Sequence, residues 1–439
     1  MPKDAIKKYL SSFSESLSLN APTNRKWRYA LVIPTYRESK FLFNTLESMP
    51  TPSGGLLVIL VINRPPWDKR EDSNQELRCF ISNLQESFKK TNKVEIKYLK
   101  EGVDILFIDH EKIFKPYTPS NVGLARKIGC DLALAWHSAG TIDSDWLSST
   151  DADAILPPDY FDRIEKTDPS SKAICWPFSH MPSNDSSLDA ACKMYVSHLH
   201  HYTLGLTYAK SPFNYHSLGS CISVRARAYA EVRGFPKRDA GEDFYMLNKL
   251  RKVGEIKRLT GQCISIATRE SDRVPFGTGP AISMIVDSKV TPPEYKLYNP
   301  QCFAALRAVI NSIPNLWGNT AEPLRDILEK QNLSADLAVA AEESLIKLGI
   351  TKAIDHCLEH ASSKTTFLKH FLIWFDAFRT LKFIHQLEDS HLPKILLRNY
   401  HNYLPLNWPI DIRQELSLDD LLAAHRKYFE WSTVESSHW

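Results

Sequence analysis

The sequence predicts an α/β fold, in which helices flank a mainly parallel sheet, followed by a mainly helical C-terminal domain. Between Tyr29 and Thr150, short apolar runs alternate with helix-like stretches, which is typical of strands connected by helices. After about Val290 the strand signals fade, and apolar residues recur with helical spacing. The length of 439 residues exceeds that of one ordinary domain and accommodates both parts.

Residues 1–26 are expected to form an N-terminal amphipathic helix. Ile6, Tyr9, Leu10, Phe13 and Leu17 fall on one helical face. The stretch lacks the continuous apolar core of a secretory signal peptide. We therefore expect a cytoplasmic protein.

The elements between Tyr29 and Thr150 follow in a regular order. Strands are expected at Ala30–Ile33, Leu56–Ile62, Val94–Tyr98, Ile105–Ile108 and Trp146–Thr150, and helices at Ser39–Ser48, Asn74–Lys89 and Asn121–Ser138. Open sheets of this kind bind ligands beyond the carboxyl ends of their strands. Polar side chains that follow a strand are therefore the first candidates for a site.

The C-terminal part is expected to be helical. Helices are predicted at Ala335–Leu348, Lys364–His385 and Leu416–Phe429. Thr291-Pro292-Pro293 interrupts helical structure and suggests domains at 27–290 and 291–439. His356 and His360 share a helical face, but the residues between them do not have the Glu-x-x arrangement of a zinc protease, so no such site is expected.

Composition excludes several classes of protein. The 54 basic and 51 acidic residues nearly balance and form no long run of one sign, so nucleic acid is not expected as a partner. The eight cysteines contain no C-x-x-C pair, which indicates reduced thiols and not a zinc site or a disulfide framework. The longest apolar run, Leu56–Ile62, is far too short to span a bilayer, so we expect no transmembrane segment.

Asp151-Ala152-Asp153 places two carboxylates at the end of a strand. Carboxylate oxygens suit Mg²⁺ or Mn²⁺, which keep coordination positions open for phosphates when the protein supplies few ligands. The same spacing occurs at Asp143-Ser144-Asp145, but that pair lies in a polar connector and is assigned no metal. The sequence therefore predicts a metal and diphosphate site at Asp151 and Asp153.

Three further segments carry candidate site residues, and each also has an ordinary structural interpretation. Pro34-Thr35-Tyr36, with Glu38 beyond it, ends the first strand and can flank a base or simply form a turn. Asn121 can cap a helix from which Arg126 reaches a diphosphate or lies in solvent. Glu242 and Asp243 open a helix as an acid–base pair or as carboxylates that stabilise its N-terminus.

Taken in order, these segments and Asp151-Ala152-Asp153 resemble the family 2 glycosyltransferases over roughly residues 27–283. The resemblance implies a GT-A fold. It also implies a metal-dependent, inverting transfer of a sugar, typically a hexose, from a nucleoside-diphosphate sugar to an acceptor hydroxyl. Neither the acceptor nor the oligomeric state follows from it.

The resemblance also implies roles for single residues. On the donor side, the residues expected to contact the nucleotide sugar are Pro34, Thr35, Tyr36, Glu38, Asn121 and Arg126. Asp153 is expected to bind Mn²⁺ or Mg²⁺ directly, and Asp151 is expected to contact the ribose or a metal-bound water. On the acceptor side, Asp243 is the expected catalytic base and Glu242 supports it.

Two further features lie near these motifs. Arg269 and Arg273 lie in a loop that could close over a diphosphate, or they are ordinary surface cations. Asn63 follows the second strand where the family usually has an Asp that accepts from the base. Because an amide can both donate and accept, we expect weaker discrimination among bases.

Two other functions are considered. A sugar-phosphate nucleotidyltransferase would need a glycine-rich basic loop after its first strand, and Pro34-Thr35-Tyr36-Arg37-Glu38 is not one. A catalytically silent binding protein on the same fold is the second alternative, and the intact Asp151, Asp153, Glu242 and Asp243 argue against it.

Overall fold

The computed structural model describes residues 3–15, 21–22, 25–38, 40–65, 67–70, 72–86, 96–113, 121–318, 322–412, 414–415 and 417–431. The chain divides into two compact units. The α/β unit comprises Met1–Leu188 and Ser217–Ser283, and the helical unit comprises Asp189–His216 and Met284–Trp439. This division differs from the expected boundaries, because the sequence places residues 189–216 in the 27–290 domain.

The main sheet of the α/β unit is mostly parallel, as the sequence predicts. Within the described residues it has eight strands. In sheet order they are β10 (Ile256–Arg258), β7 (Ala173–Cys175), β9 (Ile222–Arg225), β5 (Trp146–Ser149), β1 (Tyr29–Thr35), β2 (Leu56–Ile62), β4 (Val103–Asp109) and β3 (Ile96–Lys100). The contiguous strands β5, β1, β2 and β4 are parallel, so their carboxyl ends share one edge.

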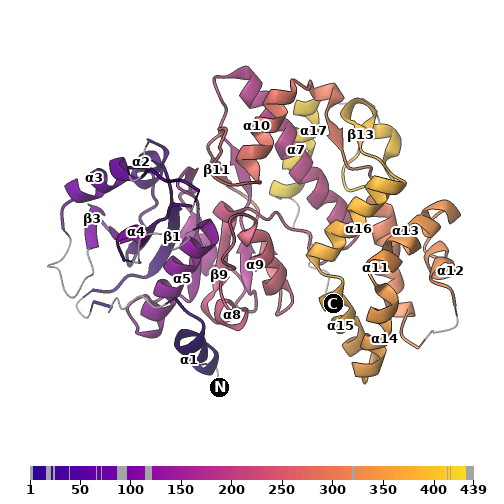
Figure 1. Cartoon of the computed structure of the whole chain (residues 1–439), viewed down its shortest axis with the longest axis horizontal. Coiled ribbons are helices and arrows are strands. Elements are labelled where there is room, and N and C mark those ends of the chain that lie inside the picture. The colour runs from indigo at the N-terminus through magenta and orange to yellow at the C-terminus, as the bar shows by residue number, and fades with distance from the viewer. Residues whose placement is uncertain are drawn as a thin grey trace. The chain divides into compact units, whose positions relative to one another are not determined.

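The central strands form here because their side chains are apolar on both faces. All seven residues of β2 are buried, and so are all seven of β1. Strands buried on both faces are typical of a parallel sheet covered by helices. Helix α5 (Val122–Ser138) provides part of that cover by packing on β1, β2 and β5 (Figure 1).

The other elements of the α/β unit complete its layers. A small sheet has the strand order β6 (Ala154–Ile155), β11 (Ile264–Ile266), β8 (Phe178–His180). The other helices of the unit are α1 (Lys3–Ser12), α2 (Lys40–Glu47), α3 (Gln75–Asn83), α4 (His110–Ile113), α6 (Tyr160–Glu165), α8 (Ala226–Glu231) and α9 (Glu242–Arg251). A 3₁₀ turn, η1 (Gly219–Cys221), precedes β9. Helix α3 is shorter than the predicted Asn74–Lys89, and Ser39, Lys89 and Val94, predicted as ends of elements, lie outside the described residues.

Helix α1 is attached to the sheet domain through a buried polar cluster. Tyr9 donates to Asp131 Oδ1 over 2.5 Å, and Tyr229 donates to the same oxygen over 2.7 Å. Lys127 lies 2.9 Å from the other oxygen, Asp131 Oδ2. Because these buried groups are paired with one another, the amphipathic helix is part of the α/β unit and not a separate element.

The helical unit is built mainly from helices, again as predicted. Its helices are α11 (Gln301–Ser312), α12 (Leu324–Glu329), α13 (Ala335–Lys347), α14 (Ile350–His360), α15 (Lys364–Trp374), α16 (Ala377–Ser390) and α17 (Leu418–Trp431); α7 (Ser186–Tyr208) and α10 (Thr278–Ser288) cross the boundary between the units. Short elements add η2 (Pro292–Glu294), η3 (Ile313–Asn315), η4 (Leu397–Tyr403), β12 (Lys296–Leu297) and β13 (Ile395–Leu396).

The prediction of a single helix at Lys364–His385 is wrong, because the structure has two helices there. The chain breaks at Phe375-Asp376 into α15 and α16. Asp376 adopts an extended backbone conformation and accepts a hydrogen bond from Arg379 N over 3.1 Å, which caps α16. Helical periodicity continues across the break, so the apolar pattern alone did not reveal it.

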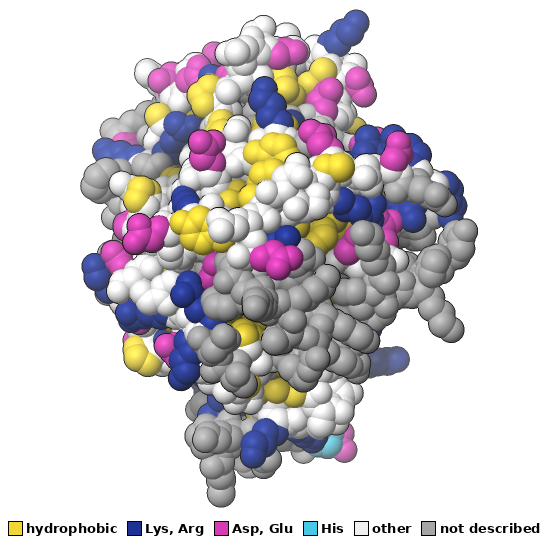
Figure 2. Space-filling view, turned by 90° about the vertical axis from the view of Figure 1, so that its left-hand side faces the viewer, with side chains coloured by type: hydrophobic (Ala, Val, Ile, Leu, Met, Phe, Trp, Pro, Cys, Tyr) yellow, Lys and Arg dark blue, Asp and Glu magenta, His cyan; other side chains and the backbone are white. Residues whose placement is uncertain are grey.

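The surface agrees with the balanced charge of the sequence. On the face shown in Figure 2, basic and acidic side chains are interspersed over the part that the structure describes. Among the described helices, none has the length and apolar character needed to cross a membrane.

Candidate functional site

The sequence motifs meet at the carboxyl edge of the main sheet. Asn63, directly after β2, donates its backbone N–H to the carbonyl oxygen of Thr35 over 3.0 Å. Thr150, directly after β5, donates in the same way to Val32, also over 3.0 Å. The turns that contain Tyr36, Asn63 and Asp151 therefore follow three adjacent strands of one sheet.

Arg126 lies at the centre of this region. Asn121 caps α5 by accepting from Leu124 N over 2.8 Å, as predicted, and Arg126 follows in the next turn. Its side chain is 2% exposed. Nε donates to Glu242 Oε1 over 2.9 Å, Nη1 donates to Ser149 Oγ over 2.7 Å, and Nη2 forms an ion pair with Asp151. One guanidinium thus joins the carboxylate after β5 to the first residue of α9.

This arrangement differs from the diphosphate contact expected for Arg126. All three guanidinium nitrogens already donate to protein oxygens. Burial alone would lower the pKa of Arg126, but the negative charges of Asp151 and Glu242 outweigh it and raise that pKa. Arg126 therefore remains a cation that orients two carboxylates.

Two glycines leave room for these contacts. A Cβ on Gly219 would lie 2.3 Å from Arg126 Nη2, so only glycine admits the guanidinium there. A Cβ on Gly123 would lie 2.3 Å from the carbonyl oxygen of Pro236, on the segment that leads to α9. Both positions need glycine because another group approaches closely.

Glu242 and Asp243 form the first turn of α9, as the sequence predicts. Glu242 is 4% exposed and is held by Arg126. Asp243 Oδ1 accepts from Phe244 N over 2.7 Å. Burial, and next the charge of Glu242, raise the pKa of Asp243 to about 7, against the opposing effects of the Phe244 N–H and of Arg126. Asp243 can therefore exchange a proton near neutral pH.

The loop after β11 carries Arg269 and Arg273, whose side chains pair with Asp153 and Glu38. Arg269 Nε donates to Asp153 Oδ2 over 2.7 Å, and its Nη2 donates to Glu38 Oε1 over 2.6 Å. Arg273 also forms an ion pair with Glu38 and donates to the carbonyl oxygen of Tyr36 over 3.2 Å. The structure therefore brings Glu38, Asp153, Arg269 and Arg273 together in one charged cluster.

The carboxyl group of Asp153 is perturbed within this cluster. Burial raises its pKa; the charge of Arg269 opposes that effect, and the charge of Asp151 adds to it. The side chain of Asp153 is 12% exposed, and that of Asp151 is 37% exposed. The two carboxylates of the motif thus have different surroundings, although only one residue separates them.

Asp151 and Asp153 have the oxygen ligand atoms that a divalent cation requires, but each forms an ion pair with an arginine here. Among the residues that the structure describes, three His, Cys, Asp or Glu ligand atoms do not converge at this place. A Mg²⁺ or Mn²⁺ ion held by two carboxylates takes its other ligands from phosphates and water. The residues fit such an ion, provided that Arg269 releases Asp153.

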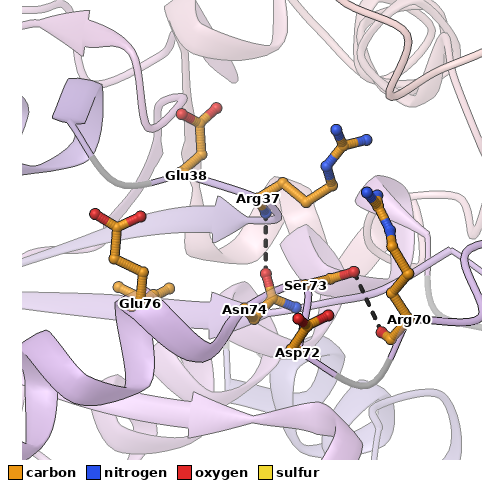
Figure 3. Close-up of a pocket in the computed structure, with 8 residues that line it drawn as sticks. Arg37, Glu38, Arg70, Asp72, Ser73, Asn74 and Glu76 are labelled. Atoms are coloured by element: carbon orange, nitrogen blue, oxygen red, sulfur yellow. Dashed lines mark hydrogen bonds between the residues drawn. The ribbon is translucent and has the colours of Figure 1, made fainter.

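A cavity of about 260 Å³ lies beside the end of β1 (Figure 3). Its lining residues are Arg37, Glu38, Arg70, Asp72, Ser73, Asn74, Glu76 and Leu77. Asn74 fixes one wall, because its side chain accepts from Arg37 N over 2.9 Å and donates to the carbonyl oxygen of Asn63 over 3.1 Å. Polar groups therefore border the cavity on both the β1 and the α3 side.

Of the predicted nucleotide-sugar contacts, Glu38 lines this cavity, whereas Tyr36 and Asn63 are not among its lining residues; Arg37 and Asn74 line it but were not predicted. Tyr36 and Asn63 are only 6% and 5% exposed, and the hydroxyl of Tyr36 donates to Asp68 over 2.6 Å. The available signal was the run Asp72-Ser73-Asn74, since such residues commonly precede a helix and can offer side-chain oxygens.

No protein-family model matches the chain, and no curated protein sequence matches it either. Solved structures with some likeness include the mannosyltransferase PcManGT from Pyrobaculum calidifontis in complex with GDP-Man and Mn²⁺ (12% identity, 89% of this chain and 95% of that chain, TM-score 0.33). Residues 1–349 of S. aureus TarS in complex with UDP-GlcNAc are another (12% identity, 92% of this chain and 89% of that chain, TM-score 0.34).

Proposed function

We propose that this protein is an inverting glycosyltransferase that moves a sugar from a nucleoside-diphosphate sugar to an acceptor hydroxyl. The observation that carries the proposal is the pairing of Arg126 with both Asp151 and Glu242. Through it, the expected donor-side acid and the expected acid–base pair form one site at the ligand-binding edge of an α/β sheet.

The donor side is built from the cavity and the neighbouring carboxylates. The cavity beside Arg37 and Asn74 would take the nucleoside, and Asp151 and Asp153 would hold Mn²⁺ or Mg²⁺ next to the diphosphate. Such a cation, when bound, neutralises charge on the departing nucleoside diphosphate. Arg269 and Arg273, which now pair with Asp153 and Glu38, would exchange these carboxylates for diphosphate oxygens.

The chemical step would use Asp243 as the base. The acceptor oxygen attacks the anomeric carbon from the face opposite the diphosphate, its proton passes to Asp243, and the bond to the diphosphate oxygen breaks. A pKa of about 7 suits this transfer near neutral pH. Arg126 keeps Glu242 in place beside Asp243, and the charge of Glu242 helps to raise that pKa.

Calorimetric titration with UDP, GDP and TDP in the presence of Mn²⁺ tests the donor site. At least one nucleotide should bind to the wild-type protein, and Asp153→Asn should abolish the Mn²⁺-dependent part of its affinity. Asp145→Asn is the matched control, because Asp145 occupies the same spacing but pairs with Arg225 over 2.6 Å. Equal binding by the Asp153→Asn variant and the wild type would refute the assignment.

One observation favours the alternative of a silent binding protein. Arg269 already neutralises Asp153, so a cation has no free carboxylate there until the arginine moves. A silent protein would bind a nucleoside diphosphate but would release none from any nucleotide sugar. Turnover therefore separates the two functions, whereas binding does not.

A further inference from the structure

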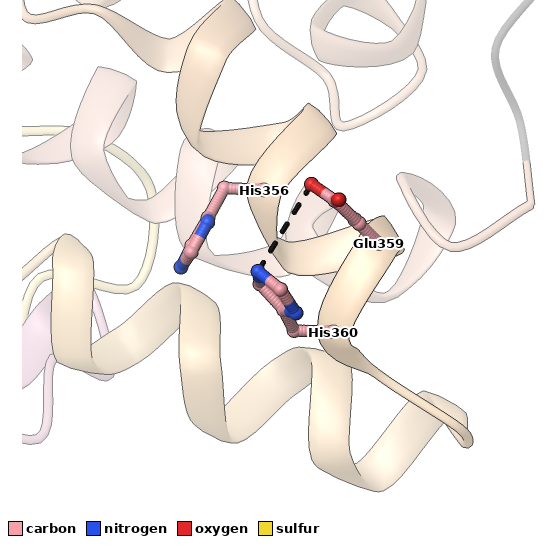
Figure 4. Close-up of side chains that lie close together, drawn as sticks. All are labelled: His356, Glu359 and His360. Atoms are coloured by element: carbon pink, nitrogen blue, oxygen red, sulfur yellow. Dashed lines mark ion pairs between the residues drawn. The ribbon is translucent and has the colours of Figure 1, made fainter.

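Helix α14 carries a cluster of potential metal ligands in the helical unit. His356, Glu359 and His360 are all exposed, and one ligand atom from each lies within 4.8 Å of the others. Figure 4 shows the three side chains close together. This is the only group of its kind among the described residues.

Local helix geometry explains the cluster. Residues four apart lie on the same side of a helix, so the rings of His356 and His360 are neighbours, with centroids 4.4 Å apart. Glu359 Oε2 lies 4.0 Å from His360 Nε2. The intervening Cys357 is buried and faces the interior of the unit, so it does not compete for a metal.

The spacing suits a small change of side-chain rotamers around an ion. Zinc bonds of about 2.0–2.1 Å at tetrahedral angles place ligand atoms about 3.3 Å apart. The present 4.0 Å between Glu359 and His360 approaches this value, and exposed side chains are free to adjust. His360 is also the last residue of α14, where the helix dipole favours a positive charge.

We propose that His356, Glu359 and His360 form a surface site for a late first-row divalent cation, of which Zn²⁺ is the representative. Two imidazoles and one carboxylate select Zn²⁺, Ni²⁺ or Cu²⁺ over Mg²⁺. With three protein ligands the fourth position remains open to water. The proposal is independent of the proposed glycosyl transfer.

The chain offers a matched comparison for this site. His391 Nε2 lies 3.9 Å from Glu343 Oε2 in a second histidine–carboxylate pair of the helical unit. That pair has no second imidazole among the described residues that meet at it. If Zn²⁺ bound to any histidine beside a carboxylate, it would bind at both places. If binding requires three ligands, Zn²⁺ binds only to the cluster on α14.

Calorimetric titration of the metal-stripped full-length protein with Zn²⁺ in a non-coordinating buffer tests the proposal. All proteins would carry Asp153→Asn, so that the acidic site in the α/β unit does not contribute. Losing one ligand should weaken Zn²⁺ binding at least as much as losing a supporting residue, which is about tenfold or more. We expect this loss for His356→Ala and for His360→Ala, a smaller loss for Glu359→Gln, and no change for His391→Ala.

Competition supplies a second readout. Cu²⁺ should displace Zn²⁺ from the site, and Mg²⁺ should not. Far-UV circular dichroism checks that the variants keep their helices, which exposed substitutions should not disturb. Unchanged Zn²⁺ affinity in both histidine variants, or no Zn²⁺ binding in the parent protein, would overturn the proposal.

Discussion

Arg126 Nε donates a hydrogen bond to Glu242 Oε1 over 2.9 Å, although 116 residues separate them in the sequence. The same guanidinium pairs with Asp151. The buried guanidinium of Arg126 therefore holds the carboxylates of Asp151 and Glu242 in one place.

Replacing Arg126 should destabilise the fold. Arg126→Lys keeps the positive charge but replaces the fork that contacts Glu242, Ser149 and Asp151 with a single ammonium, which leaves buried acceptors unpaired at a typical cost of about 1–3 kcal/mol. Urea unfolding of the variant and the wild type measures this loss. Arg227→Ala is the control, because its ion pair with Glu231 is exposed and should contribute less than about 1 kcal/mol. Equal stability of Arg126→Lys and wild type would refute the role of Arg126.

Asp243→Asn should slow the chemical step by roughly a hundredfold or more, as expected for the loss of a positioned base, while donor affinity stays nearly unchanged. Single-turnover rates and separate binding measurements distinguish these quantities. A parallel loss of binding and rate would place Asp243 at the donor and make Glu242 the better candidate for the base.

The pKa of Asp243 makes a prediction about pH and activity. A base with a pKa of about 7 is mostly protonated at pH 6, so the rate there should be about a tenth of the plateau reached above neutral pH. The pH–rate profile of the wild type measures this. A flat profile between pH 6 and 8 would show that another group accepts the proton.

The same shift predicts an effect on stability. The folded protein keeps a proton on Asp243 that the unfolded chain loses near its ordinary pKa of 3.8, so the group destabilises the fold increasingly as pH rises from about 4 to about 7. Asp243→Asn removes this cost. The variant should therefore gain thermal stability over the wild type at pH 8 and show little gain at pH 4, as thermal unfolding at both values would reveal.

Arg269→Ala should raise the affinity for Mn²⁺ in the absence of a nucleotide, because it frees Asp153. If the pair contributes about 1 kcal/mol, the upper value for exposed ion pairs, the gain is about fivefold. Electron paramagnetic resonance of free Mn²⁺ measures it. Arg37→Ala is the control, since Arg37 pairs with the exposed Asp272 at 3.5 Å. Unchanged affinity in Arg269→Ala would mean that Asp153 does not bind the ion.

The contribution of Asn63 to base preference stays a prediction. Asn63→Asp should shift binding toward UDP relative to CDP, because a carboxylate accepts from the ring N–H of uracil, whereas the corresponding ring nitrogen of cytosine carries no proton and can only accept. Unpaired polar groups in a buried pocket cost about 1–3 kcal/mol, which corresponds to about five- to a hundredfold in relative affinity. Calorimetry with both nucleotides tests it. Identical preferences in the variant and the wild type would show that Asn63 does not face the base.

Much of the fold followed from local patterns. Leu56–Ile62 is a strand with the predicted bounds, since a short continuous aliphatic run that is rich in β-branched residues is typical of a strand buried on both faces. Asn121 caps α5 as its position suggested. The break at Asp376 and the membership of residues 189–216 in the helical unit depend on packing between distant segments, which local periodicity does not contain.

The site was predictable in its residue types and less so in its contacts. The carboxylates at Asp151, Asp153, Glu242 and Asp243 were recognised because each follows a strand or opens a helix. The pairing of Arg126 with Glu242, and of Arg269 with Asp153 and Glu38, joins segments more than 100 residues apart. Such pairings depend on the topology of the sheet, so the spacing of residues in the sequence does not predict them.

Release of nucleoside diphosphate from a panel of nucleotide sugars, measured with Mn²⁺ at pH 8 and with water taking the place of the acceptor hydroxyl, tests the central claim most directly. The wild type should release the diphosphate from at least one donor. Asp153→Asn should release none, and Asp243→Asn should bind the donor yet release the diphosphate roughly a hundredfold more slowly. Binding of a nucleoside diphosphate by the wild type without release from any nucleotide sugar would contradict the claim and identify a silent binding protein.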